Sequence, residues 1–336
     1  MHNPEAAILW LLDSDPSIRW QTMRDLLDLP ETQWGSERQK VESEGWGAGL
    51  LRRQDPDGQW AGGAFVPSDF DWSEWDTEGQ PWTATSFVLS QLREFGLDPA
   101  CESAKRTVDL IARNSKWDHA GEPFWEGEVE ECINGRVLAD GAYFGVDVKL
   151  IAERLVADRQ PDGGWNCERV GGSLCSSFAT TINVLEGLLE YEKATGGTPE
   201  SKQARASGEA YLLKRHLFRR LTTGDPADER FLQFLHPNRW HYDVLRALDY
   251  FRTSSIHDGT AADLRLRDAI EHVRSRQRPG GTWVLDWQTQ GRVWFEVDDS
   301  PGTPSKWLTL RALRVLKWWD DEHNLKRSHV RRPQQD

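Results

Sequence analysis

The chain of 336 residues alternates between two kinds of segment in which apolar side chains recur at the i, i+3, i+4, i+7 spacing of a helix face. Segments of the first kind are apolar most of the way round and carry little charge: Pro16–Leu29, Trp82–Gly96, Cys132–Gly145, Ser176–Glu192, Trp240–Arg252 and Ser305–Trp319. Segments of the second kind are amphipathic and charged: Pro4–Leu12, Ser36–Arg53, Pro99–Ser115, Val148–Arg159, Pro199–His216 and Ala261–Arg276. The best strand-like stretch, 293–297, is too short to build a sheet.

The alternation predicts the fold class. A helix that is apolar all round is buried on several sides, whereas a striped helix covers a core from outside. Pro99, Pro199 and Pro304 fit first-turn positions of helices, and Gly96 and Gly145 fit helix ends. We therefore expect an all-α protein with an inner ring of six helices and an outer ring of six.

A loop containing Gln, Gly and Trp recurs between a charged segment and the apolar segment that follows it. The copies are QDPDGQW (Gln54–Trp60), QPDGGW (Gln160–Trp165) and QRPGGTW (Gln277–Trp283), spaced 106 and 117 residues apart, and Trp117 and Trp125 mark a degenerate copy. Glycine permits a tight turn, the Gln amide offers hydrogen bonds to helix termini, and the indole packs while donating one N–H. The pattern predicts loops that tie helix ends together.

These loops resemble the QW motifs of the superfamily that contains squalene–hopene cyclases and protein prenyltransferase β-subunits. The resemblance covers nearly the whole chain and implies a single α6/α6 toroid, two concentric rings of six helices, over residues 1–325. Residues 326–336 are basic and lack apolar periodicity, so we expect a disordered tail there. Because the motif is structural in that superfamily, the resemblance gives the QW residues no catalytic role.

Composition and charge exclude several classes of protein. The 41 Lys and Arg residues against 54 Asp and Glu give a formal charge of −13, which argues against nucleic-acid binding. No apolar run could span a membrane, and the N-terminal segment lacks the features of a signal peptide. We therefore expect a cytoplasmic protein with reduced thiols, a Cys167–Cys175 disulfide being the alternative. No nucleotide-binding glycine motif and no HExxH motif is present.

An acidic sequence, EVDDS at Glu296–Ser300, precedes the last apolar segment. It resembles the D-x-D-D motif of class II terpenoid cyclases, although Glu replaces the first Asp and SPGTP separates it from the helix. The resemblance implies that Asp298 protonates an alkene or epoxide, while Glu296 and Asp299 orient its proton. Neighbouring carboxyls cannot all ionise, which favours a protonated acid. The alternative interpretation is an acidic turn that caps a helix.

A second candidate site combines EVEEC with RWHYD. The pair resembles the Asp, Cys and His with which protein prenyltransferases bind zinc. The resemblance implies Cys132, His241 and a carboxylate, either Glu130 or Asp243, as ligands. Three such ligands with an open position suit catalytic zinc. Packing and helix capping explain a lone Cys and a lone His equally well.

Aromatic residues gather near the starts of the apolar segments, where we expect the mouth of a central cavity and a lid at 61–81. The chain holds 18 Trp, more than its 12 Phe or 5 Tyr. Aromatic faces with carboxylates suit a carbocation, a cation or a sugar. The predicted substrate-binding residues are Trp72, Trp75, Trp82, Phe178, Trp240, His241 and Trp307.

Basic residues on or near the apolar segments leave two interpretations open. Lys306, Arg136, Arg246 and Arg311 either meet an anionic group such as a diphosphate or form salt bridges with the plentiful acids. The acidic balance of the chain favours salt bridges.

The leading functional hypothesis is a terpenoid-cyclase-like isomerase or lyase. It would act on an isoprenoid or similar apolar substrate in an aromatic-lined cavity, with no cofactor other than zinc in view. The alternatives are a zinc-dependent prenyltransferase-like enzyme, a non-catalytic lipid-binding or isoprenoid-binding toroid, and a carbohydrate-active α6/α6 barrel. The last requires two carboxylates about 5 to 9.5 Å apart, drawn from Asp76, Glu128, Asp243 and Asp298. A homo-oligomer or a second subunit would be compatible with each.

Overall fold

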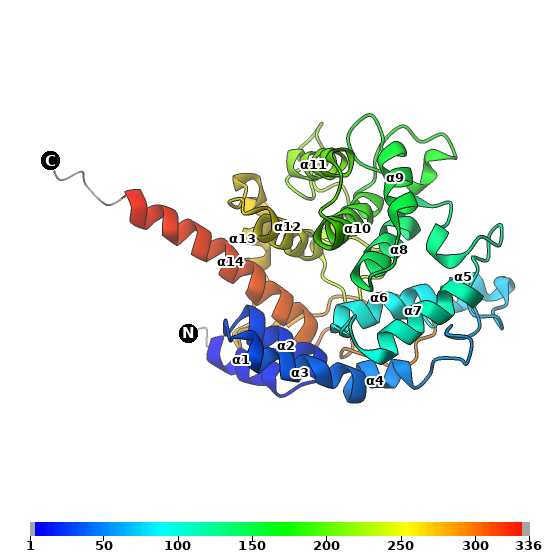
Figure 1. The fold of residues 1–336 in the computed structure, drawn as a ribbon. Helices are drawn as coiled ribbons and strands as arrows, with labels where there is room; N and C mark the ends of the chain where they lie inside the picture. Colours follow the sequence, from blue (N-terminus) through cyan, green and yellow to red (C-terminus); the bar gives the residue numbers. More distant parts are fainter. Residues whose placement is uncertain (1–3, 331–336) are drawn as a thin grey trace.

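A computed structural model describes residues 4–330, and this part of the chain is mostly helical (Figure 1), which confirms the all-α class. Six helices contact one another in a closed cyclic order, in which α2 contacts α6, α6 contacts α8, and so on through α10, α12 and α14 back to α2. Their bounds are α2 Pro16–Asp25, α6 Thr85–Phe95, α8 Glu131–Tyr143, α10 Phe178–Thr195, α12 Val244–Asp258 and α14 Lys306–Val330. These six inner helices correspond to the six segments predicted to be buried.

The other helices precede or follow the inner ones along the chain. Their bounds are α1 Pro4–Leu12, α3 Glu31–Ser43, α4 Gly45–Leu51, α5 Trp75–Glu78, α7 Glu102–Asn114, α9 Lys149–Ala157, α11 Pro199–Lys214 and α13 Arg267–Ser275. Short 3-10 turns are η1 Trp72–Glu74, η2 Phe124–Glu126, η3 Cys167–Arg169, η4 Glu229–Leu232 and η5 Leu264–Leu266. Helices α1 and α3 contact α2, α9 contacts α8, α11 contacts α10, and α13 contacts α12 and α14, so each covers an inner helix.

Apart from isolated bridges, the β-structure of the described residues is one two-residue ladder. Strand β1 (Trp283–Val284) pairs antiparallel with β2 (Pro304–Ser305), and Trp283 lies opposite Ser305. The strand-like stretch 293–297 forms no strand. Within residues 4–330 no helix is both long enough and apolar enough to cross a membrane.

The charged segment Ser36–Arg53, which the sequence predicts as one helix, is two helices that meet at Gly45. Gly45 has a φ of +60°, and a Cβ there would overlap the carboxylate of Asp15. That carboxylate accepts the Trp46 backbone N–H at 2.8 Å and the Ser17 N–H at 2.8 Å. One side chain thus caps α2 and holds the start of α4, which explains the break.

Each clean QW loop joins an outer helix to the next inner helix in the same way. The indole N–H of Trp60, Trp165 and Trp283 donates to a backbone carbonyl ten residues earlier, at 2.8, 2.6 and 2.7 Å. Their backbone N–H groups donate to a buried threonine hydroxyl in or near the first turn of the following inner helix, namely Thr85, Thr181 and Thr309. The indole, rather than the Gln amide, therefore satisfies the end of the outer helix.

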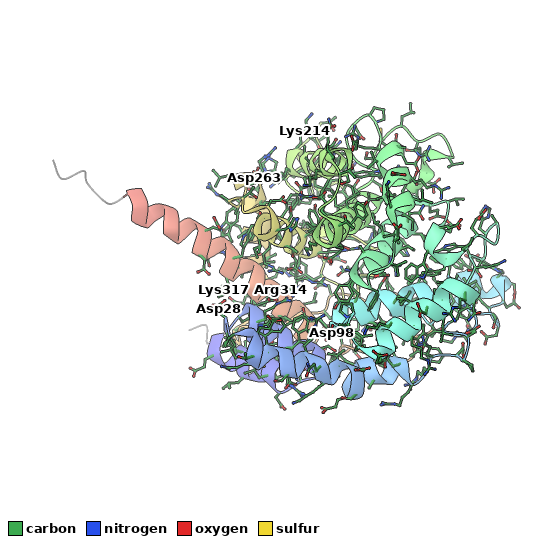
Figure 2. All side chains as sticks on the ribbon, viewed as in Figure 1. Asp28, Asp98, Lys214, Asp263, Arg314 and Lys317 are labelled. Atoms are coloured by element: carbon green, nitrogen blue, oxygen red, sulfur yellow. The ribbon has the colours of Figure 1, made fainter. Side chains whose placement is uncertain are left out.

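The last helix, α14, runs past the rest of the molecule (Figure 1). Near α2 an ion pair holds it in place: the Lys317 amine lies 3.0 Å from the Asp28 carboxylate, and Arg314 lies next to Lys317 (Figure 2). The predicted tail begins at 326, within this helix, and residues 331–336 lie outside the described residues.

Candidate functional site: a central cavity lined by arginine

A cavity of about 740 Å³ is lined by residues from all six inner helices. Its lining is charged, which corrects the prediction of an apolar, aromatic-lined cavity. Ten lining residues are basic and five are acidic. The basic ones are Arg24, Arg38, Arg93, Arg136, Lys193, Arg239, Arg246, Arg252, Arg311 and Arg314, and the acidic ones are Asp25, Glu94, Glu186, Glu190 and Asp249. In a chain of net charge −13, this concentrates positive charge at one internal place.

Most of the lining acids already have a basic partner. Glu186 accepts two hydrogen bonds from the guanidinium of Arg246, at 2.8 and 2.7 Å. Glu94 accepts from Arg311 at 2.9 Å, and Asp249 pairs with Arg252 at 2.9 Å and also with Arg314. The arginines Arg246 and Arg311 therefore form the salt bridges that the sequence favours, within the cavity wall.

Arg136 and Arg239 form no salt bridge with a carboxylate of the described residues, although acidic residues lie near enough to raise the pKa of each in part. Arg136 donates to the Ser86 carbonyl at 3.4 Å and the Ser90 hydroxyl at 3.1 Å, both neutral groups. The Arg239 Nε atom is buried without a hydrogen-bond partner among the described residues, and so is the Ser86 hydroxyl. Burial lowers the pKa of Arg136 to about 10; burial and the nearby Arg136 lower the pKa of Arg239 to about 9.

Each of these two guanidinium groups lies over an aromatic ring. Arg136 lies over the ring of Phe87, 4.6 Å from its centroid, and Arg239 lies over Trp82 at 5.1 Å. The rings of Trp82 and Phe87 are themselves 4.8 Å apart, edge to face. Cation–π contacts hold the guanidinium planes in place while leaving N–H groups for a ligand.

The loop before α12 places Arg239 in the cavity. Arg239 has a φ of +52°, a left-handed conformation that few non-glycine residues adopt. The preceding Asn238 is buried, accepts a bond from Arg311, and donates to Asp243 at 2.6 Å. Asp243 in turn caps α12 by accepting the Arg246 N–H at 2.8 Å. These buried hydrogen bonds stabilise the unfavourable backbone conformation of Arg239.

His236 lies in the same loop and is buried, with 1% of its side chain exposed. Neither ring nitrogen has a hydrogen-bond partner among the described residues, and the ring stacks on Trp307 at 4.8 Å. Its Nδ1 atom lies 3.8 Å from the Glu94 carboxylate. Burial, with Arg311 and Arg239 nearby, lowers the pKa of His236 well below its ordinary value, so the imidazole is neutral.

The predicted mouth at the starts of the inner helices is in the wrong place for this cavity. The lining includes residues at or near the ends of inner helices, such as Asp25, Gly96, Tyr143 and His257. Of the loops that precede inner helices, the one containing Arg239 contributes to it. The loops before α6 and α14 instead bind one another, because Trp82 and Trp294 donate across them at 2.7 and 3.0 Å.

The acidic sequence Glu296–Ser300 lies outside the cavity lining. The Asp298 carboxylate accepts the hydroxyl of Ser305, which caps α14 through the Leu308 N–H at 3.0 Å. Burial is the main reason that the pKa of Asp298 rises to about 6, with a smaller contribution from Asp299. Glu296 and Asp299 are exposed. The Asp298 carboxyl is therefore half-buried and readily protonated, but its hydrogen-bond partner is the side chain that caps α14.

None of the predicted substrate-binding aromatics lines the cavity. Trp82, Phe178 and Trp307 are buried in aromatic clusters, and Trp307 contacts Trp46 and Phe95. Trp240 is 38% exposed and stacks on His241 at 3.8 Å. Trp72 and Trp75 form an exposed stack at 5.6 Å, within the predicted lid. The carboxylates considered for a glycosidase, Asp76, Glu128, Asp243 and Asp298, also lie outside the lining.

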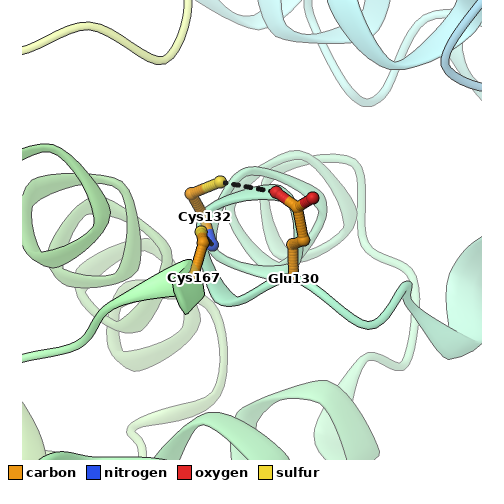
Figure 3. Close-up of side chains that lie close together, drawn as sticks. All are labelled: Glu130, Cys132 and Cys167. Atoms are coloured by element: carbon orange, nitrogen blue, oxygen red, sulfur yellow. Dashed lines mark hydrogen bonds between the residues drawn. The ribbon is translucent and has the colours of Figure 1, made fainter. Parts of the chain in front are cut away.

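The thiol cluster differs from the predicted zinc ligands. Glu130, Cys132 and Cys167 have ligand atoms within 4.8 Å of one another (Figure 3), whereas His241 is not in this set. A carboxylate and two thiols are donors that zinc accepts. The His241 ring instead lies against Trp240 and Trp287, and burial lowers the pKa of His241 to about 4. The four cysteines are free thiols, and the close pair is Cys132–Cys167 rather than Cys167–Cys175.

The sequence identified part of this site and missed the rest. Arg136, Arg246 and Arg311 line the cavity, the last two in ion pairs, whereas Lys306 contacts the Asp13 carbonyl and Trp10 instead. Arg239 was missed because it lies in a loop between two elements, with no helical spacing to align it. The sequence pattern predicts less charge on the cavity-facing sides of the inner helices than they carry, because the aliphatic stem of an arginine packs as an apolar group.

No protein-family model matches the chain, and no curated protein matches it in sequence. Two solved structures are similar in fold. A protein from Actinoplanes is 16% identical, with a TM-score of 0.48 over 94% of this chain and 98% of that one. A variant of the type II terpene cyclase MstE from Scytonema, bound to geranylgeranyl dihydroxybenzoate, is 16% identical, with a TM-score of 0.45 over 95% of this chain and 96% of that one. At this identity neither similarity assigns an activity to the chain.

Proposed function

We propose that the chain is an α6/α6 toroid that binds an anionic organic molecule in its central cavity, with Arg136 and Arg239 as the anion site. The observation that carries the proposal is a pair of guanidinium groups in the lining of one cavity, neither of which forms a salt bridge with a carboxylate of residues 4–330. The closed order of contacts from α2 to α14 and back supports the toroid.

Burying like charges together is unfavourable unless something compensates for them. Burial chiefly, and repulsion from the nearby Arg136 in addition, disfavour the charged form of Arg239, and two acidic residues offset this only in part. An anion with two or more oxygen atoms would accept their free N–H groups and remove this repulsion. Phosphate, sulfate and carboxylate groups all have suitable acceptors.

The remainder of the cavity would hold the organic part of the ligand. Trp20, Tyr143, Leu189 and Ile256 line it, along with the ion pairs already described. A volume of about 740 Å³ is in the range of small-molecule sites. The mixed lining fits a polar molecule with some apolar surface better than it fits a hydrocarbon.

The test is a thermal-shift screen with phosphate esters, sulfate esters, dicarboxylates and neutral analogues of similar size. Binding to the native state raises the melting temperature, and we expect at least one anionic class to do so while its neutral analogue does not. The doubly substituted Arg136→Met/Arg239→Met protein should lose that response. Arg113→Met, on the exposed face of α7, is the matched control and should retain it. Equal responses of the two variants would contradict the proposal.

A second candidate function is acid-initiated cyclisation by Asp298. The observation in its favour is a half-buried carboxyl whose pKa rises to about 6, since a general acid must carry its proton near neutral pH. Asp298→Asn would keep the bond to Ser305 and remove the acid. If an isoprenoid substrate is found, this variant should lose turnover while retaining substrate binding; undiminished turnover would exclude Asp298 as the acid.

A further inference from the structure

Two cysteines far apart in the sequence meet at the start of α8. Cys132 is the second residue of that helix, and Cys167 lies two residues after the tryptophan of the second QW loop. Their sulfur atoms and a carboxylate oxygen of Glu130 lie within 4.8 Å of one another (Figure 3), so a disulfide requires the two sulfur atoms to move together by no more than about 3 Å.

The hydrogen bonds give the two sulfur atoms different roles. The Cys167 sulfur accepts the backbone N–H of Cys132 at 3.3 Å and the hydroxyl of Thr180 at 3.4 Å. Two donors on one sulfur stabilise negative charge there. The Cys132 thiol donates in the other direction, to the Glu130 carboxylate at 3.6 Å. Cys167 is therefore arranged as the nucleophile, and Cys132 as the thiol that resolves its oxidised form.

The pair is reachable from solvent. Cys132 and Cys167 are each half-buried, and Glu130 is exposed. The other two cysteines lie outside this set: Cys175 is exposed, and Cys101 is the cap of α7, where its sulfur accepts the Ala104 N–H at 3.4 Å. They provide internal comparisons for any thiol chemistry.

We propose that Cys132 and Cys167 are a redox-active pair that forms a reversible disulfide on reaction with a peroxide. The Cys167 thiolate attacks one peroxide oxygen, the O–O bond breaks, and hydroxide leaves to become water, which gives a sulfenic acid. The Cys132 sulfur then displaces the hydroxyl group, and its proton passes through Glu130 to form a second water. The two thiols lose two electrons and the peroxide gains them, and a dithiol reductant reverses the change.

The disulfide would join the first turn of α8 to the loop before α10, whose first turn holds Thr180. Helix α8 also carries Arg136, one turn beyond Cys132. Neither sulfur lines the central cavity, although Cys132 lies near enough to Arg136 to affect its pKa.

The experiment uses the whole chain, reduced and freed of metal with a chelator, then treated with hydrogen peroxide and alkylated. We expect the loss of two of the four titratable thiols, a mass decrease of two hydrogen atoms, and a peptide cross-link between Cys132 and Cys167 that dithiothreitol reverses. In Cys132→Ser the reaction should stop at a sulfenic acid on Cys167, which dimedone traps. Cys175→Ser is the control and should form the same cross-link.

Two results would overturn the proposal. One is peroxide reaction without the Cys132–Cys167 cross-link, including a cross-link that involves Cys175 or Cys101. The other is a pair that resists peroxide and alkylation until the chelator removes a tightly bound metal, and that still forms no cross-link afterwards. Circular dichroism of each serine variant separates lost chemistry from lost folding.

Discussion

Removing the charge of Arg239 should stabilise the unliganded protein, whereas removing that of Arg246 should destabilise it. Both side chains line the same cavity and both are arginines, so the comparison holds residue type and location constant. Arg239 forms no salt bridge with a carboxylate of residues 4–330, while Arg246 makes two bonds to Glu186 and one to the His241 carbonyl at 2.7 Å. Methionine retains most of the apolar stem in either case.

The magnitudes follow from the surroundings of each guanidinium. A guanidinium ordinarily titrates above pH 12, so a pKa of about 9 for Arg239 corresponds to about 4–5 kcal/mol of unfavourable free energy for its charged form. The lost contact with Trp82 offsets about 1–2 kcal/mol of the gain. We therefore expect Arg239→Met to raise the free energy of unfolding by about 2–4 kcal/mol. Arg246→Met leaves Glu186 unpaired and should lower it by about 3–5 kcal/mol.

The assay is urea unfolding at neutral pH and low salt, followed by tryptophan fluorescence and far-ultraviolet circular dichroism. Coincident transitions by the two probes would permit a two-state fit. The sign of the change in Arg239→Met is the decisive quantity. A destabilisation comparable to that of Arg246→Met would refute the reasoning, because it would mean that Arg239 is already compensated within the protein.

Three further substitutions test individual contacts. Trp165→Phe removes the hydrogen bond to the Leu155 carbonyl and should lower the free energy of unfolding in urea by about 1–3 kcal/mol. Trp72→Phe, in the exposed aromatic stack, should change it by less than about 0.5 kcal/mol. Equal effects of the two substitutions would argue against a role of Trp165 in joining helix ends. Burial depresses the pKa of His236, so the unfolded chain binds a proton that the folded protein does not. Below about pH 6.5 the wild type should therefore lose up to about 1.4 kcal/mol of stability per pH unit relative to His236→Phe. Parallel stability profiles of the two proteins against pH would contradict a neutral buried imidazole. Because the pKa of Asp298 is raised to about 6, the wild type should lose stability relative to Asp298→Asn as pH rises from about 4 to about 6, with no further loss above that range.

The helical plan could be predicted because periodicity is a local property of the chain. The predicted segment Trp82–Gly96 contains α6, and the predicted segment Cys132–Gly145 overlaps all but the first residue of α8, so the predicted ends lie within a few residues of the observed ones. The repeated Trp loops could be predicted as structural links for the same reason. The break at Gly45 could not, because it depends on Asp15, thirty residues earlier, which bonds the Trp46 N–H.

The site was harder to predict than the fold, because it depends on which side chains meet across the ring. Periodicity placed Arg136 on a buried helix but could not show whether an acid would reach it. Arg239 comes from a loop whose conformation depends on buried Asn238 and Asp243. The acidic sequence at Asp298 had the composition expected of a catalytic acid, yet its hydroxyl partner is the cap of α14. Composition alone does not distinguish these cases.

The most direct test of the anion site is diffraction from a crystal of the protein soaked in selenate, measured at the selenium absorption edge. An oxyanion of this kind is a divalent acceptor with the geometry of sulfate or phosphate. The account predicts an anomalous peak inside the cavity, with oxygen atoms in hydrogen-bond range of the Arg136 and Arg239 guanidinium groups, that disappears in Arg136→Met/Arg239→Met. Peaks confined to surface arginines, with none between these two residues, would contradict it.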